Sequence, residues 1–378
     1  MATKLVQDSS LTSIANAIRT RGGTSASLVF PTDFVSAINN IPGGSANIES
    51  LSITQNGTYT ASGGVDGYSP ITVSVSGGGS DAEDGIIQRT ISGTYENSRV
   101  STIGSYAFYY CSSLTAVSFP NVTTIGNYAF NYCISLTTAS FPSVTSIGTG
   151  AFSFCYNLAI ASFSNVTIIN NYAFAYCSSL TTASFPNVTL INSNAFFNCY
   201  NLATISFPKV TTIDSKAFYY CNSLTTASFP SATTIGSSAF YTCHNLATIS
   251  FPNVTTIGNY AFYCCSSLTT INFPKVTTIG SSAFSDCRGL TTASFPSVTS
   301  IGNSAFIYCY NLMSVIILAS SVPYLGSTTV FSDTPIGGYT TSTGGVYGSI
   351  FVPASLVASY KTAPNWSIYS ERITSYVE

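Results

Sequence analysis

Residues 122–142 read VTTIGNYAFNYCISLTTASFP, and this stretch decides the fold because close copies of it recur ten times along the chain. In every copy a phenylalanine stands three residues before a cysteine, and a leucine stands three residues after it. A period of this length predicts a solenoid, in which each copy forms one coil and buries its apolar side chains against its neighbours. The cysteines that mark the 22-residue period are Cys111, Cys133, Cys155, Cys177, Cys199, Cys221, Cys243, Cys265, Cys287 and Cys309.

Each copy contains apolar patterns typical of strands. Residues 136–141 (LTTASF) end in an alternation of apolar residues with serine, which predicts a strand with one buried face. Pro142 ends this strand because proline cannot donate to a ladder of hydrogen bonds. Residues 122–125 predict a second short strand, and Ala129 with Phe130 predicts a short helical turn that returns to the core. The copies should therefore stack into parallel β-sheets.

The ten copies resemble the BspA-type leucine-rich repeat, whose consensus is IGxxAFxxCxxLxxIxLP. The likeness covers about residues 99–318 and implies a right-handed leucine-rich-repeat solenoid that presents a surface for binding. One departure is an alanine at the middle strand position, where the family usually has isoleucine, so the core should be slimmer there. The alanines are Ala139, Ala183, Ala227 and Ala293.

The flanking segments break the period and predict separate roles. Residues 86–98 are the expected N-terminal cap and residues 319–378 the expected C-terminal cap, since a bare solenoid end would expose a sheet edge. Residues 44–76 predict a small β module, because two short β-rich runs flank an Asn-Gly turn and a third follows. The glycine-rich residues 77–85 predict a flexible linker.

Residues 1–43 predict two short amphipathic helices that form an attachment segment. They cannot bury a core of their own, so they are expected to dock on a partner or on copies of themselves. Residues 11–41 and 53–75 resemble segments at the front of tail and tail-fibre proteins of phages that infect Gram-positive bacteria. This resemblance implies that residues 1–76 contact other virion tail proteins. Fibre proteins are often trimers, so a homo-oligomer is an open alternative by analogy only.

The composition limits the partners. Only 6% of the residues are charged and the net charge is −2. The chain therefore lacks the positive charge that would attract nucleic acid or an anionic membrane. No apolar run approaches the ~18 residues of a membrane span. Residues 1–8 (MATKLVQD) show no signal peptide. We therefore expect a protein made in the host cytoplasm that reaches the outside as part of a virion tail.

The cysteine ladder is the most conspicuous chemical feature. Each cysteine lies between core phenylalanine and leucine positions, so buried free thiols that act as small apolar groups are expected. Disulfides between neighbouring coils and a metal site are the weaker alternatives, because the side chains run parallel and no second type of ligand converges on them. We therefore predict neither a metal nor a cofactor.

Catalysis has little support in the sequence. His244 is the only histidine and follows Cys243 directly, but alternation along the chain sends the two side chains to different sides. Asp214 and Asp286 are 72 residues apart in the repeats. Strand spacing separates them by roughly 15 Å, beyond the ~5–9.5 Å of paired glycosidase carboxylates. We predict that the protein is not an enzyme.

Two exterior features remain as candidate binding surfaces. Rows of threonine and serine occupy the outward strand positions, although these residues also simply suit an exposed strand. Aromatic residues flank the cysteines, and rigid amphipathic rings suit a sugar or a protein partner. The alternative is that the tyrosines only shield the turns. The candidate residues are Tyr110, Tyr132, Phe154, Tyr176, Tyr220 and Tyr308 before the cysteines, and Tyr156, Tyr200, His244, Arg288 and Tyr310 after them.

The resulting hypothesis is a phage tail-associated protein, similar to a tail fibre or receptor-binding protein. Its solenoid would bind a host-surface glycan or protein. A bacterial surface adhesin of the BspA-like family is one alternative, and a structural virion spacer without a ligand is another.

Overall fold

A computed structural model describes residues 50–54, 59–62, 72–76, 92–340 and 344–377. The chain divides into two compact units, Met1–Ser80 and Asp81–Glu378. The helices predicted within residues 1–43, the linker at 77–85 and residues 86–91 of the expected N-terminal cap lie outside the described residues.

The first unit contains a three-stranded sheet, in the order β2-β1-β3. Strand β1 (Ser50–Thr54) pairs antiparallel with β2 (Tyr59–Ser62) and parallel with β3 (Thr72–Ser76). These strands fall within residues 44–76, for which the sequence predicts a β module.

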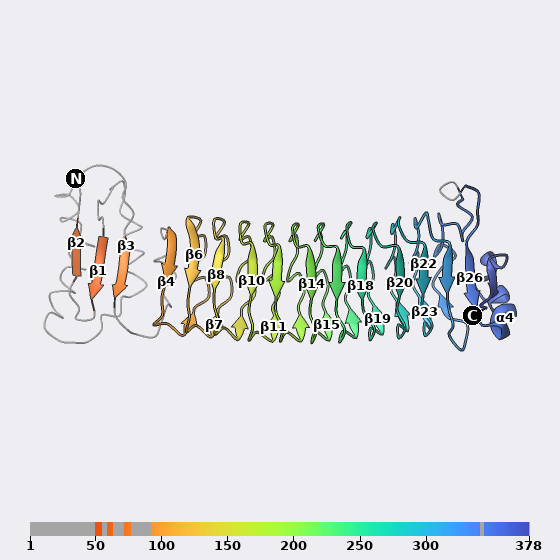
Figure 1. Cartoon of the computed structure of the whole chain (residues 1–378), viewed down its shortest axis with the longest axis horizontal. Helices are drawn as coiled ribbons and strands as arrows, with labels where there is room; N and C mark the ends of the chain where they lie inside the picture. The colour runs from red at the N-terminus through yellow and green to blue at the C-terminus, as the bar shows by residue number, and fades with distance from the viewer. Residues whose placement is uncertain (1–49, 55–58, 63–71, 77–91, 341–343, 378) are drawn as a thin grey trace, which may run out of the picture. The chain divides into compact units, whose positions relative to one another are not determined.

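The second unit is a parallel β-solenoid, as the period predicts (Figure 1). Its narrow face is one eleven-stranded sheet of two-residue strands. Identical positions of successive coils are partners, so Ile191 pairs with Ile213 and Ile213 pairs with Ile235. The strands of this face are β5 (Thr102–Ile103), β7 (Thr124–Ile125), β9 (Ser146–Ile147), β11 (Ile168–Ile169), β13 (Leu190–Ile191), β15 (Thr212–Ile213), β17 (Thr234–Ile235), β19 (Thr256–Ile257), β21 (Thr278–Ile279), β23 (Ser300–Ile301) and β25 (Tyr324–Leu325).

The wide face carries the longer strands that follow the cysteines. It is not one continuous sheet but three, with the orders β4-β6-β8, β10-β12-β14-β16-β18 and β20-β22-β24-β26-β27. All pairs within them are parallel. The strands are β4 (Gly93–Glu96), β6 (Leu114–Ser118), β8 (Thr138–Ser140), β10 (Ile160–Ser162), β12 (Thr182–Ser184), β14 (Thr204–Ser206), β16 (Thr226–Ser228), β18 (Thr248–Ser250), β20 (Thr270–Asn272), β22 (Thr292–Ser294), β24 (Ser314–Ile316), β26 (Ser349–Val352) and β27 (Ile373–Ser375).

The short helical turn predicted for Ala129 and Phe130 is not formed, and that part of the prediction is wrong. Tyr128 and Tyr132 have φ angles of 55° and 60°, in the left-handed region that breaks a right-handed helix. The backbone N–H of Phe130 donates to the carbonyl of Ala151 in the next coil at 2.7 Å, so these turns join neighbouring coils. Bonds between coils therefore offset a conformation that costs roughly 1–2 kcal/mol per residue.

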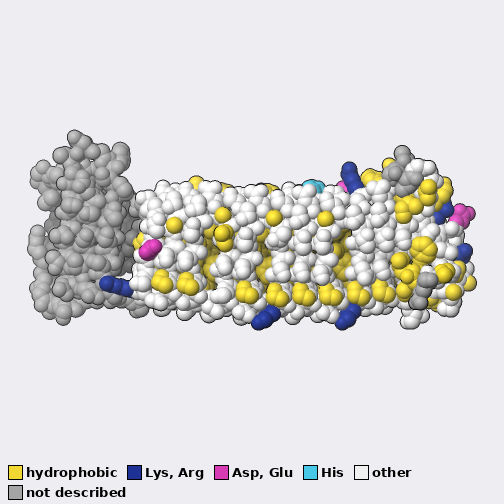
Figure 2. Space-filling model, in the orientation of Figure 1, with side chains coloured by type: hydrophobic (Ala, Val, Ile, Leu, Met, Phe, Trp, Pro, Cys, Tyr) yellow, Lys and Arg dark blue, Asp and Glu magenta, His cyan; other side chains and the backbone are white. Residues whose placement is uncertain are grey.

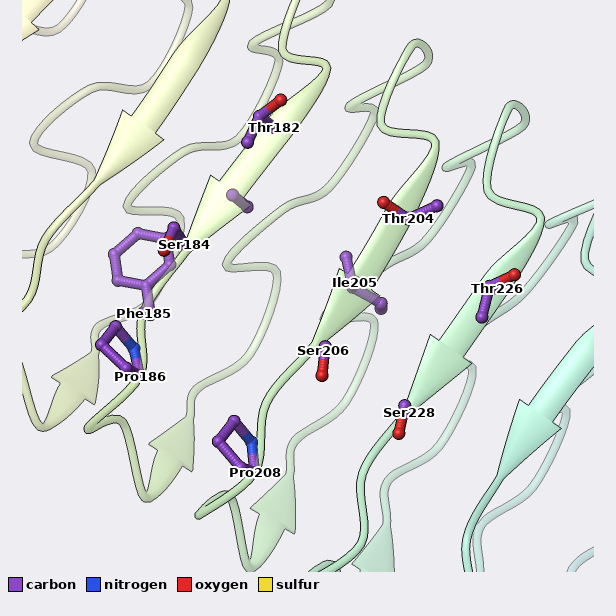
Figure 3. A pocket seen from close by; sticks show the side chains of 11 residues that line it. Thr182, Ser184, Phe185, Pro186, Thr204, Ile205, Ser206, Pro208, Thr226 and Ser228 are labelled. Atoms are coloured by element: carbon purple, nitrogen blue, oxygen red, sulfur yellow. The ribbon is translucent and has the colours of Figure 1, made fainter.

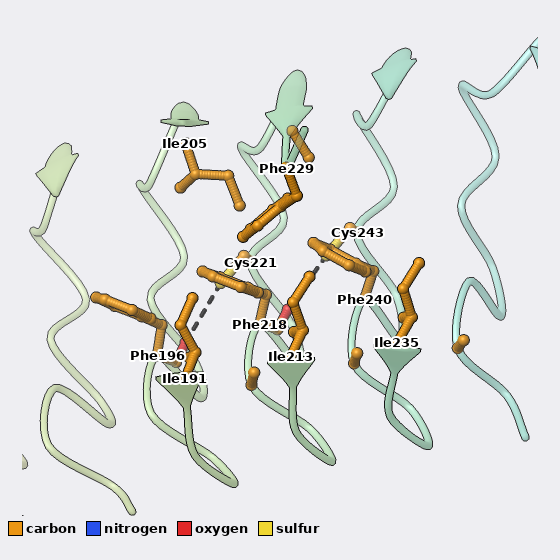
Figure 4. Close-up of a cluster of buried hydrophobic side chains, with 14 of the residues drawn as sticks. Ile191, Phe196, Ile205, Ile213, Phe218, Cys221, Phe229, Ile235, Phe240 and Cys243 are labelled. Atoms are coloured by element: carbon orange, nitrogen blue, oxygen red, sulfur yellow. Dashed lines mark hydrogen bonds between the residues drawn. The ribbon is translucent and has the colours of Figure 1, made fainter. Parts of the chain in front are cut away.

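Two ladders of phenylalanine fill the core. In the ladder from Phe108 to Phe331 the rings stack face to face, with centroids 4.8 to 5.6 Å apart. A second ladder begins at Phe119 and meets the first at an angle, as in the Phe218–Phe229 pair at 5.9 Å and 61°. Figure 4 shows several of these rings beside the isoleucines of the narrow face. The stacking is the reason that a single repeated sequence suffices for the whole solenoid.

The ladder cysteines are buried free thiols, which confirms that prediction. The Cys221 thiol donates to the carbonyl oxygen of Phe196 in the preceding coil at 3.3 Å, and Cys243 repeats the bond to Phe218 at 3.2 Å (Figure 4). The Phe196 carbonyl also accepts the N–H of Cys199. A cysteine thus fills a small space and satisfies the second lone pair of a buried carbonyl, which alanine could not do.

Aromatic side chains close both ends of the core. At the N-terminal end the Tyr95 ring packs on Phe108 and Phe119 at 5.4 and 5.6 Å. At the other end Trp366 is buried, and its indole N–H donates to the carbonyl of Pro323 at 2.8 Å. The helical elements of this cap are η2 (Ala354–Leu356), α4 (Val357–Thr362) and η3 (Ser367–Tyr369).

The buried thiols predict a steep loss of stability in alkali. Burial raises the pKa of these thiols above the ordinary range, so the folded chain keeps their protons while the unfolded chain releases them above a pKa of ~8.5. Their stabilising contribution is complete below that pH. Above it, each thiol lowers the free energy of unfolding by about 1.4 kcal/mol per pH unit. The affected thiols are Cys155, Cys177, Cys199, Cys221, Cys243, Cys265, Cys287 and Cys309.

Thermal unfolding followed by circular dichroism across the alkaline range measures this effect. The Tm should fall steeply above the ordinary thiol pKa, and Cys221→Ala should reduce that slope by the share of one thiol while lowering the Tm at neutral pH. A Tm that stays constant in alkali, or native ladder thiols that react with Ellman's reagent, would contradict the burial of these groups.

Candidate binding surfaces

The first four candidate residues before the cysteines form one stack. Tyr110, Tyr132, Phe154 and Tyr176 lie face to face in successive coils, with ring centroids 4.5, 4.3 and 4.4 Å apart and ring planes within 10° of parallel. The structure therefore brings these residues together as a continuous aromatic row.

Beyond Tyr176 the stack moves to a sequence position that is not among the predicted candidates. Tyr176 contacts Phe197 at 5.4 Å, and the row continues through Tyr219, Tyr241 and Tyr263 with centroids 4.6 to 4.9 Å apart. These four aromatic residues stand two positions before their cysteines. A signal was present in the sequence, because three of these coils lack an aromatic residue directly before the cysteine. The residues found there are Asn198, Thr242 and Cys264.

Stacking decides which part of each ring a ligand could reach. A ring that lies between two neighbours has both faces covered, so only its edge and its hydroxyl group point to solvent. The row thus offers a line of phenol groups and few free faces for a sugar ring. Each stacked pair stabilises the turns by about 0.5–1.5 kcal/mol. We conclude that the row has a structural role in addition to any binding role.

The candidates after the cysteines are separate from one another. Tyr156 and Tyr200 are 40% and 41% exposed and stand two coils apart, with Ser178 between them. The Tyr156 ring is turned by 82° relative to Phe154, so it stands outside the stack. Burial, followed by the nearby Tyr176 and Tyr220 phenols, raises the pKa of Tyr200. These rings are better placed than the row to offer a face.

The remaining candidates occupy different surroundings. Tyr220 contacts Tyr219 edge to face at 4.7 Å, and therefore borders the aromatic row. Tyr308 is 43% exposed and lies 6.1 Å from Tyr310. His244 is exposed, and its Nδ1 lies 3.0 Å from the carbonyl oxygen of Cys264. The eleven candidates therefore do not form a single site.

Arg288 belongs to a small polar cluster. Its Nε donates to Asp286 at 2.7 Å, and its guanidinium lies 5.7 Å from the Tyr310 ring centroid. The Cys264 thiol donates to the other oxygen of Asp286 at 2.8 Å. Burial, aided by Asp286, raises the pKa of Cys264 to about 12, so this thiol stays protonated at neutral pH. Such a thiol is a poor nucleophile.

Neither a metal site nor a membrane span is found in the part of the chain that the structure describes. There, no three His, Cys, Asp or Glu side chains group so as to hold a metal ion. Among the same residues, no helix combines the length and the apolar character needed to cross a bilayer.

A shallow hollow of about 370 Å³ lies on the wide face over β12, β14 and β16 (Figure 3). Its floor contains the apolar side chains of Ala183, Phe185 and Ile205, and Pro186 and Pro208 line it as well. Hydroxyl groups stand along it at the outward strand positions, and no lining residue is charged. The hydroxyl-bearing residues are Thr182, Ser184, Thr204, Ser206, Thr226 and Ser228.

The hollow lies where the strand ladder is reduced to a single residue pair. Between β12 and β14 only Thr182 and Thr204 are paired, whereas β14 and β16 pair at three positions. Ala183 is partly exposed beside this opening, but the equivalent Ala227 is fully buried where the ladder is closed. A local separation of two strands therefore partly uncovers Ala183 between rows of hydroxyls.

The hydroxyls at the outward strand positions of the hollow, like Thr292 at the equivalent position of another coil, are not used in side-chain hydrogen bonds, in contrast to the threonines one residue earlier. Thr181 and Thr225 donate their Oγ1 protons to backbone carbonyls of the preceding coil, at 3.2 and 3.1 Å. No such bond is formed by the six hydroxyl groups in the hollow, where every contacting residue is described. They remain available to a ligand as donors and as acceptors.

Comparison with known proteins agrees with the repeat pattern. Residues 101–225 and 211–336 match the family described as the BspA type Leucine rich repeat region. No curated protein matches the chain.

Three solved structures are similar to this chain. A leucine rich cell surface protein from Faecalibacterium prausnitzii is 25% identical, with 73% of this chain and 89% of that chain covered and a TM-score of 0.37. A leucine-rich repeat protein from Eubacterium ventriosum is 26% identical, with 68% and 72% covered and a TM-score of 0.43. The leucine rich repeat protein of T. pallidum is 26% identical, with 50% and 82% covered and a TM-score of 0.37.

Asn198 stands directly before its cysteine, where the neighbouring coils have Tyr176 and Tyr220, and it provides a test of the structural role of the aromatic residues. The residue is only 8% exposed, and its Oδ1 atom is buried without a hydrogen-bond partner, which costs about 1–3 kcal/mol. Its φ of 59° matches that of Tyr220 in the next coil, so a tyrosine fits the backbone. We expect Asn198→Tyr to raise the Tm by about 2–4 °C per kcal/mol recovered, measured by calorimetry.

Asn165→Tyr serves as the control, because Asn165 donates to the carbonyl of Pro142 at 3.1 Å. That variant should lower the Tm. If both variants lower it equally, the aromatic row does not stabilise the turns.

Proposed function

This chain belongs to the BspA-type leucine-rich repeat family, and we propose that it is a binding protein that attaches its carrier to a glycan or protein on a cell surface. The observation that carries this proposal is the hollow on the wide face, where six unpaired hydroxyl groups flank an apolar floor. Unpaired polar groups beside apolar surface are the usual elements of a recognition site.

The positions of the reactive side chains in the coils favour a binding function over catalysis. The ladder thiols are buried and donate to backbone carbonyls, so they are not available as nucleophiles. Cys264 is kept protonated next to Asp286, and the His244 ring hydrogen-bonds to a backbone carbonyl. Most exterior side chains are hydroxyls, amides and aromatic rings, which can bind a ligand without carrying a charge.

We propose that the chain is part of a phage tail, in which the solenoid binds the host surface and residues 1–76 contact other tail proteins. Support comes from the resemblance of residues 11–41 and 53–75 to the front of tail and tail-fibre proteins. A trimer is part of this proposal by analogy with such fibres. A bacterial surface adhesin of the same family and a virion spacer without a ligand are the alternatives that the next experiment separates.

The first test is the binding of the full chain to isolated Gram-positive cell walls. We expect saturable binding that unlabelled protein displaces. Because few charges are present, raising the salt from about 0.05 to 0.5 M should change the affinity by less than about twofold. Heat-unfolded chain is the control.

The second part of the test locates the protein with an antibody. Signal in purified phage particles supports the tail proposal, and signal confined to bacterial walls supports the adhesin. The absence of saturable binding to any wall would leave only the spacer and would overturn the binding proposal.

A further inference from the structure

The wide face opens at three places, and the hollow is the middle one. Its strand ladder is interrupted between β8 and β10 and between β18 and β20, and is reduced to one pair between β12 and β14. Ala139, Ala183 and Ile249 border these openings and are partly exposed. At closed parts of the ladder the equivalent Ala227 and Ala293 are fully buried. Figure 2 shows this face, on which apolar streaks lie between rows of uncharged polar side chains.

Hydroxyl groups follow the same pattern of exposure. Beside the openings, Thr182 and Thr204 are exposed, whereas Thr226 and Thr292 at better-paired strands are only half exposed. Each opening therefore combines an uncovered apolar strip with the most accessible hydroxyls of the face. The openings are two and three coils apart, which corresponds to roughly 10 and 14 Å along the axis.

The chemistry of the openings favours a saccharide. A pyranose ring has apolar C–H faces and a rim of hydroxyls that both donate and accept, which complements an apolar floor between rows of threonine and serine. The hollow of about 370 Å³ has the size of a small-ligand site. A protein partner would need exposed aromatic or arginine anchors, whereas Phe185, the one aromatic residue that lines this hollow, is buried and no arginine lines it.

Two more features limit the kind of ligand: the hollow has no charged lining residue, and the three openings lie in a line along the solenoid axis. No charged side chain lines the hollow, so an anionic polymer would gain nothing there. Several weak sites along one axis are best used by one long molecule, because each contact after the first becomes intramolecular.

We propose that the wide face binds a neutral polysaccharide that runs along the solenoid axis, with the hollow over β12 and β14 as its central subsite. This inference rests on the proposed binding function and names its ligand. The C–H face of one sugar ring lies on Ala183 and against Pro186 and Pro208, and its hydroxyls bond to the exposed threonines and serines. The neighbouring openings hold further sugars of the same chain.

Neutral hexose and N-acetylhexosamine oligosaccharides, from disaccharide to octasaccharide, are the probes. We expect the affinity of the full chain to rise with oligosaccharide length. Thr204→Val keeps the shape of the side chain and removes one hydroxyl, so it should weaken binding about three- to tenfold with an unchanged Tm. Thr292→Val is the matched control, because β22 is fully paired on both sides, and it should change the affinity less than about twofold.

A second variant tests the apolar floor. Ala183→Ile introduces the residue found at the same position in other coils, such as Ile205, and should abolish binding to the hollow while the Tm is kept. Unchanged glycan affinity in Thr204→Val and Ala183→Ile would overturn the proposed subsite.

Binding experiments with cell walls distinguish a failure of this inference from a failure of the proposed function. If the chain binds walls but protease treatment of the walls removes the binding, the partner is a protein, and the polysaccharide proposal fails while the binding function stands. If the chain binds no wall and no oligosaccharide, both fail. Loss of wall binding in Ala183→Ile, but not in Thr292→Val, supports both.

Discussion

The structure depends on the superposition of identical residues once per coil. Equivalent residues pair as strands on two faces, and equivalent phenylalanines stack in the core. From Cys133 to Cys309, the ladder thiols donate to a carbonyl of the preceding coil. A coil cannot provide these contacts to itself, so each coil is stable only between two others. Aromatic caps at both ends protect the first and last coils.

This constraint also decides where function can reside. Core positions are committed to neighbours, and the stacked tyrosine row presents mainly ring edges. What remains is an exterior with few charged side chains, and it is regular except where the wide face opens. The openings partly expose apolar side chains between hydroxyl groups. They are therefore the places where this regular surface offers something different to a ligand.

The sequence predicted the solenoid, the positions of both kinds of strand and the buried thiols, because each depends on a 22-residue period that is visible in the letters. It failed for the turn at Ala129 and Phe130, where bonds to the next coil override local helix propensity. It did not indicate that the aromatic stack moves by one sequence position between Tyr176 and Phe197. The signal was present, because non-aromatic residues stand directly before the cysteine in three of the coils where an aromatic residue stands two positions before it. The hollow could not be predicted, since strands with the same residues are closed at Ala227 and open at Ala183.

The most direct test of the stacked coils is the distance between spin labels on equivalent residues. Cysteines introduced at Thr138 and Thr204, and at Thr138 and Thr270, place labels three and six coils apart, with Cys264 replaced by alanine. Electron paramagnetic resonance should give label separations that increase by about 4.8 Å per coil, near 14 and 29 Å. Separations that do not grow in proportion to the number of coils would contradict the in-register solenoid.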